Sequence, residues 1–240
     1  MTLLTYILTL ISYLSTHVFA SPPEVYHNHA VWYIGNTTNP SAPNSPNVAN
    51  GLTTIVNRCP YPIYIWEAHE AYQDLHPALI PARAQKSYPI KSTYPIPQHD
   101  PCIDNCGVTY KISRTASLVG GPGGNQIQFE YSTRGAILYH DISFVDCAVV
   151  TGWQEGDAKM CPGWELAVGI EGVSGGKCKN LECGVREMCI HDAQGAYYID
   201  DPTLKWGLGA PIGTCPGYKT GTEVKFVMCA SAAPIQKEES

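Results

Sequence analysis

From Gly51 onward, short apolar runs alternate with turn signals, and several of these runs alternate apolar and polar residues with a period of two. In QIQFEYS, Ile127, Phe129 and Tyr131 fall on one side of an extended chain and the polar residues fall on the other. EVKFVMC repeats the pattern. This period is typical of half-buried strands. We expect strands at residues 52–56, 63–66, 108–112, 127–131, 137–145 and 224–228.

The same pattern predicts an all-β fold. No window of 11 or more residues shows a clean helical period, while 19 prolines, 22 glycines and only 15% charged residues favour a turn-rich chain. We predict an antiparallel β-sandwich over residues 51–147, closed by a strand near 223–229. Together these form one domain, 51–230, with a compact cysteine-rich insert at about 147–190 and a tail at 231–240. The insert lacks alternation, so we expect loops held by disulfides there.

The N-terminal 50 residues have a different composition from the rest. Residues 1–20 carry no charged side chain and end in Ala20, which is typical of a cleaved signal peptide. Residues 21–50 are rich in Pro, Asn and Ser, so we expect an arm or linker there, with a glycosylation acceptor at Asn36. No later run reaches the roughly 18 apolar residues of a membrane span. We therefore predict a secreted protein, extracellular or in a cell wall.

The cysteines and the net charge limit the kinds of site and partner that we expect for this chain. In a secreted chain the ten cysteines predict up to five disulfides, whose connectivity their spacing leaves open. No cysteine pair has the two-residue gap of a zinc knuckle and no phosphate-binding loop is present, so we expect no metal and no cofactor. A net charge of −6 disfavours nucleic acid and anionic membrane as partners. The cysteines are Cys59, Cys102, Cys106, Cys147, Cys161, Cys178, Cys183, Cys189, Cys215 and Cys229.

Four charged residues are candidates for chemistry. Glu130 lies on the polar side of its strand, and Asp141 and Asp146 are five apart, so a turn must intervene if they share a face. Arg114 falls on the apolar side and needs a carboxylate partner or a route to solvent. The pattern alone favours ordinary charges at strand ends. Aromatic residues that could stack on sugar rings are Tyr61, Tyr64, Trp66, Tyr94, Tyr139, Tyr197, Tyr198 and Trp206.

An ordered set of segments resembles the thaumatin-like proteins over residues 51–229. The segments are TTIVNRCPYPIYIW, VTYKISRT, QIQFEYS, YHDISFVDC, DAQGAYYIDDPT and TCPGYKTGTEVKFVMC. Their spacing is most similar to the fungal yeast-phase-specific protein family. The chain has fewer cysteines than plant members, and Cys147 replaces the glycine that usually follows the second aspartate of the YHDISFVDC segment.

The resemblance implies a thaumatin-like sandwich, a disulfide between Cys59 and Cys229, and an acidic cleft. Matched by motif, Arg114, Glu130, Asp141 and Asp146 would line this cleft, which in the family is linked to β-1,3-glucan binding. We therefore expect binding of β-glucan or another extracellular polysaccharide.

Two alternatives stay open. The first is a weak endo-β-1,3-glucanase, with Glu130 as acid and Asp141 or Asp146 as base or nucleophile. The second is a secreted effector or inhibitor that contacts a host protein. Because Arg114 beside Glu130 would hold that carboxyl ionised, the sequence favours binding over hydrolysis.

Overall fold

The computed structural model describes the sandwich and part of its loops. The described residues are 48–69, 72–91, 107–134, 136–152, 155–172, 178–187, 189, 195–198, 210–217 and 222–235. They all belong to one compact unit, Thr37–Ser240. Outside them lie the predicted signal peptide, residues 21–47 of the arm with Asn36, the end of the tail, Cys102, Cys106, Tyr94 and Trp206. No helix among these residues is long and apolar enough to cross a membrane.

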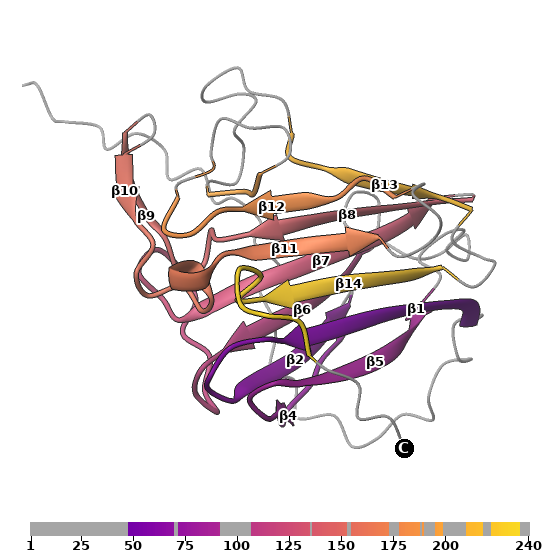
Figure 1. The fold of residues 1–240 in the computed structure, drawn as a ribbon, viewed down its shortest axis with the longest axis horizontal. Helices are drawn as coiled ribbons and strands as arrows, with labels where there is room; N and C mark the ends of the chain where they lie inside the picture. Colours follow the sequence, from indigo (N-terminus) through magenta and orange to yellow (C-terminus); the bar gives the residue numbers. More distant parts are fainter. Residues whose placement is uncertain are drawn as a thin grey trace, which may run out of the picture. The chain divides into compact units, whose positions relative to one another are not determined.

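Two sheets make up most of the described chain (Figure 1). The five-stranded sheet has the order β12 (Leu181–Cys183), β11 (Val168–Gly172), β14 (Glu223–Met228), β1 (Val48–Asn57), β5 (Ala84–Lys91). The seven-stranded sheet has the order β13 (Gly213–Pro216), β8 (Ile137–Ser143), β7 (Gln126–Arg134), β6 (Gly107–Ser113), β2 (Ile63–His69), β3 (Tyr72–Gln73), with β4 (Ala78–Ile80) also on β2. β9 (Val149–Gly152) and β10 (Glu155–Asp157) pair only with each other, and one 3₁₀ turn spans Trp164–Leu166.

The predicted all-β antiparallel sandwich is confirmed, with one parallel pair between β1 and β14. The alternation in β7 explains how the sheets pack, because Ile127, Phe129 and Tyr131 are all buried in the shared core. Phe129 stacks on Phe226 of the opposite sheet with ring centroids 5.0 Å apart. The polar residues of β7 therefore point away from the other sheet. We call this side of the seven-stranded sheet the outer face.

All six predicted strands are present, as β1, β2, β6, β7, β8 and β14. The cysteine-rich insert contributes more than loops, because β11 and β12 lie within it and β11 pairs with β14. Val168 and Ile170 of β11 are completely buried in the common core. The apolar run of β11 is too short to be recognised by its period, so its place in the sheet comes from pairing with β14 rather than from local pattern.

The disulfide between Cys59 and Cys229 is confirmed, with Cα atoms 5.1 Å apart. It joins the turn after β1 to the end of β14, the first and last strands of the domain. Three further disulfides link cysteines in or near the insert: Cys147–Cys161, Cys178–Cys215 and Cys183–Cys189. Every cysteine in the described part of the chain is therefore oxidised.

Candidate functional site

The outer face carries a row of polar residues across three central strands. Thr109 of β6, Glu130 of β7 and Asp141 of β8 lie directly opposite one another in the strand register. The Thr109 hydroxyl donates to Oε1 of Glu130 at 2.8 Å. The carboxyl groups of Glu130 and Asp141 hydrogen-bond each other. Two acidic side chains that the sequence places eleven positions apart are thus direct neighbours across a strand pair.

The protonation of this pair follows from its surroundings. Burial raises the pKa of Glu130, and the hydrogen bond from Thr109 and the charge of Lys111 oppose that rise. Burial raises the pKa of Asp141 well above its ordinary value, and the charge of Glu130 raises it further. A hydrogen bond between two carboxyl groups needs one proton, and Asp141 holds it more tightly. The pair therefore combines one acid that donates and one carboxylate that accepts.

Asp146 reaches the same face through a turn. β8 ends at Ser143, and the chain turns back with hydrogen bonds from the amides of Cys147 and Ala148 to the Phe144 carbonyl. The Asp146 carboxylate accepts from Nε2 of Gln128 at 3.0 Å and from Nε2 of Gln126, both on β7. The turn that a shared face requires is present.

Asp146 also holds the glycine-rich turn at residues 119–124. Its Oδ1 accepts the backbone amide of Gly121 at 3.0 Å. Gly121 has a φ of 86°, a conformation that favours glycine. With three donors already on its oxygens, Asp146 positions this turn and the two glutamines.

A cation that sequence analysis did not single out lies in this cluster. Lys111 is on β6, opposite Gln128 in the register, and is largely buried. Burial lowers its pKa, and the charges of Asp146 and Glu130 partly offset that effect. The alternation in VTYKIS places Thr109 and Lys111 opposite the apolar side, so the period that located the strand could have identified both residues.

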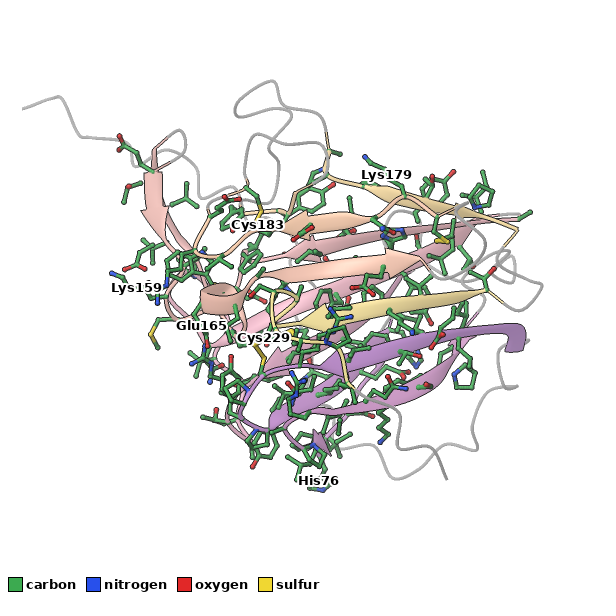
Figure 2. The ribbon with its side chains drawn as sticks, viewed as in Figure 1. His76, Lys159, Glu165, Lys179, Cys183 and Cys229 are labelled. Carbon is green, nitrogen blue, oxygen red and sulfur yellow. A yellow bond between two sulfur atoms is a disulfide. The ribbon has the colours of Figure 1, made fainter. Side chains whose placement is uncertain are left out.

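Arg114 lies in a different environment. It follows the last residue of β6, and its guanidinium forms an ion pair with both carboxylate oxygens of Glu165 in the 3₁₀ turn. The guanidinium also lies over the Tyr61 ring, 4.4 Å from the centroid. Tyr61 donates to Glu165 at 2.8 Å. The predicted carboxylate partner of Arg114 exists, but it is Glu165. Figure 2 shows Glu165 in the same region as Cys229.

The expected effect of Arg114 on Glu130 is wrong. Arg114 is not among the charges that shift the pKa of Glu130, whose pKa is raised by burial rather than lowered by a guanidinium. The sequence placed Arg114 by the alternation of side chains along the strand, and this alternation assigns a residue to a face of the sheet only within the strand. β6 ends at Ser113, so the alternation does not apply to Arg114. Lys111 is the cation beside Glu130.

The candidate aromatic residues are divided between faces. By the register, Tyr64 and Trp66 of β2 share the outer face with Ser113 and Lys111, and Tyr139 of β8 shares it with Ser132. Trp66 is nearly covered, while Tyr64 and Tyr139 are half-buried. Of the others, Tyr61 lies under Arg114 and Tyr198 stacks on Phe144.

The geometry limits what the carboxyl pair can catalyse. Carboxyl groups in glycosidases stand about 5–5.5 Å apart in retaining enzymes and about 6.5–9.5 Å apart in inverting ones. Glu130 and Asp141 instead interact directly with each other, and each shifts the pKa of the other. Among the described residues no group of three acidic, histidine or cysteine side chains is arranged to hold a metal ion. Accepting hydrogen bonds from neutral hydroxyl groups is the chemistry that this pair performs without rearrangement.

No protein-family model and no curated protein matches the chain. Among solved structures, the chain is similar to the protein elicitor MoHrip2 from Magnaporthe oryzae, with 14% identity, 75% of this chain and 98% of the other covered, and a TM-score of 0.45. It is also similar to the thaumatin-like xylanase inhibitor TLXI, with 11% identity, 72% and 97% covered, and a TM-score of 0.39.

Proposed function

We propose that this chain is a secreted, disulfide-linked protein of the thaumatin-like class that binds an extracellular polysaccharide, β-1,3-glucan first, without hydrolysing it efficiently. The observation that carries the proposal is the hydrogen-bonded pair of Glu130 and Asp141 at the centre of a polar outer face. Support for the class comes from the order of the motif-bearing segments, which form the adjacent strands β6, β7 and β8, and from the Cys59–Cys229 bond.

A sugar ligand suits the chemistry of this face. Sugar hydroxyls can donate to the carboxyl oxygens of this pair, whose own proton is engaged between Asp141 and Glu130. Thr109 continues the row on β6, and Gln128 lies two residues from Glu130 along β7. Tyr64 and Tyr139 are half-buried rings on the same face, and aromatic rings provide the stacking surface that sugars use.

Hydrolysis ranks lower because of the same contact. A general acid and a separate ionised carboxylate must stand apart to accommodate the scissile bond, and these two groups occupy each other instead. Asp146 is an unsuitable replacement, since its oxygens already accept three hydrogen bonds that position the neighbouring turn and glutamines.

The test is a pull-down on insoluble β-1,3-glucan with the double variant Glu130→Gln/Asp141→Asn. We expect bound protein to fall about tenfold or more, the loss of roughly one charged hydrogen bond. The matched control is Glu182→Gln, the exposed position of β12, which should bind like the wild type. Reducing sugar should not accumulate with laminarin. Equal binding by wild type and double variant would reject the proposed site.

A second candidate function is contact with a protein, and one observation favours it. Val119, Val149 and Met160 have exposed fractions of 55%, 40% and 61%, which is high for such residues. They lie in or beside the loop closed by Cys147–Cys161, and a side chain at Gly123 would touch Val149. Val149→Asp/Met160→Asp should leave glucan binding unchanged. Contact with a protein is the correct function if two results are obtained together. The wild-type protein does not bind glucan, and Val149→Asp/Met160→Asp abolishes the biological effect of the protein.

A further inference from the structure

A histidine lies on the inner side of β8. Leu138, His140 and Ile142 alternate with the outer-face residues of this strand and point into the core. The His140 side chain is 1% exposed. Neither ring nitrogen has a hydrogen-bond partner of good geometry in the described part of the chain. The backbone of Lys179 is the polar group that favours the charged form of the His140 ring. An imidazole in this position is stable only in its neutral form.

The ring is packed directly against the edge strand β13. His140 lies opposite Gly213 in the register of β8 and β13. A Cβ atom placed on Gly213 would lie 2.0 Å from Cε1 of the His140 ring and 2.6 Å from its Nε2. Gly213 therefore has no side chain because the imidazole fills that space. Movement of β13 away from β8 would uncover the side of the ring that Gly213 now faces.

The charges around His140 oppose its protonation. Lys179, from the segment before β12, lowers the pKa of His140 through its positive charge, and burial lowers that pKa more, to about 4. Opposite His140 in the register lie Tyr131 on β7 and the uncharged Gly213 on β13. On β11 the residues in the core are Val168 and Ile170, while Glu171 is engaged by Arg58 at 3.1 Å. None of the groups named supplies a carboxylate that would compensate an imidazolium.

Strand β13 is the part of the seven-stranded sheet that can separate from its neighbour. It has only four residues, pairs with β8 alone in the seven-stranded sheet, and is tied to residue 178 by the Cys178–Cys215 disulfide. The amide of Lys179 also donates to the Thr214 carbonyl at 2.9 Å, so residues 178–179 would follow the strand. By contrast, the central strands β6 and β7 have hydrogen-bonded neighbours on both sides.

We propose that His140 is an acid-sensitive latch for β13: protonation of its imidazole releases the β13 edge of the seven-stranded sheet while the central strands and the Cys178–Cys215 bond remain in place. The released edge exposes backbone donors and acceptors of β8 next to the outer face. The protein thereby acquires a second, open conformation in an acidic environment.

The experiment is hydrogen exchange followed by mass spectrometry on the full chain between pH 6.5 and 3.5, corrected for the intrinsic rate at each pH. In the wild type, protection in residues 213–216 should fall at least tenfold over this interval while residues 107–113 keep theirs. His140→Leu should retain that protection at pH 3.5. The matched control, His76→Leu at an exposed loop position, should behave like the wild type. Figure 2 shows His76 well away from Lys179.

Several results would overturn the proposal. One is loss of β13 protection in His140→Leu at the same pH as in the wild type, and another is simultaneous loss in β13 and the central strands. If His140→Leu does not fold, the wild-type protein still decides the question through the NMR titration of its histidine Cε1 signals. The latch requires a His140 signal that titrates together with β13 opening below pH 5. Titration near pH 6.5 with β13 closed would contradict it.

Discussion

Two of the places where charged side chains meet on the seven-stranded sheet differ in the signs of the groups involved. At the centre of the outer face two acidic side chains, Glu130 and Asp141, contact each other. At the end of β6 opposite charges meet, because Arg114 pairs with Glu165 and stacks on Tyr61. The second arrangement ties the 3₁₀ turn to the β1–β2 connection. The first joins strands that backbone hydrogen bonds already hold together.

This difference separates structural from functional charges. An ion pair that joins two separate elements adds modestly to the stability of their packing. Two acidic groups in contact cost stability, since one must keep its proton in a buried position. Costly arrangements of this kind cluster at functional sites. We therefore infer that the contacts of Arg114 at the end of β6 stabilise the fold, whereas the row of Glu130 and Asp141 binds the ligand. The predictions below test these two roles.

The largest effect on stability is expected for the Cys59–Cys229 disulfide, which lies near the Arg114–Glu165 ion pair at the end of β6. The Tyr61 hydroxyl lies 3.7 Å from Sγ of Cys229, so the cation stack and the Cys59–Cys229 bond support the same region. Replacing both cysteines by alanine should lower the free energy of unfolding by about 5 kcal/mol, because the unfolded chain loses a very long loop closure. The midpoint of urea unfolding measures this. An unchanged midpoint would show that the bond does not stabilise the sandwich.

The next effect is expected for His140. Its folded pKa of about 4 lies below the ordinary value of 6.5, so its contribution to stability is present above pH 6.5 and is lost as pH falls toward 4. The loss should reach about 3 kcal/mol in this window. Urea unfolding of wild type and His140→Leu at pH 7 and pH 4 measures it. Identical pH dependence in both proteins would refute it.

Arg114→Ala should lower the free energy of unfolding by about 1–2 kcal/mol at low salt. The variant loses a cation–π contact and a half-exposed ion pair, whose value screening by solvent reduces. Lys159→Ala, at an exposed pair with Asp157, is the control and should change stability little. Equal effects of the two substitutions would mean that the stack on Tyr61 adds nothing.

The sequence predicted the central strands well because each buries one face and alternates cleanly. Ile127, Phe129 and Tyr131 identify β7 without help from any partner. β11, β12 and β13 escaped prediction because they are three to five residues long and depend on neighbours for their pairing. Within the candidate site, Glu130 could be placed on the polar side, whereas its contact with Asp141 depends on a strand register that turn lengths and packing set.

The smallest stability effect is expected at the outer face, and its sign is opposite. Glu130→Gln/Asp141→Asn should raise the free energy of unfolding at pH 7 by about 0.5–1 kcal/mol, the size of one cross-strand pair, because the variant no longer has to keep a proton on a buried acid. Folded pKa values raised above the unfolded ones give stability that is present below about pH 4 and is lost as pH rises through the folded values. The double variant should therefore show a flatter decline from pH 4 to 8. A steeper decline would be inconsistent with shared protonation.

The most direct test of whether Arg114 stabilises the fold while Glu130 and Asp141 bind the ligand is to measure binding and stability together for Arg114→Ala and Glu130→Gln/Asp141→Asn. Binding isotherms on particulate β-1,3-glucan, recorded well below the unfolding temperature, should show wild-type affinity for Arg114→Ala. The double variant should bind at least tenfold more weakly despite being the more stable protein. If Arg114→Ala abolishes binding and the double variant binds normally, the functional site lies at the end of β6 and our assignment is wrong.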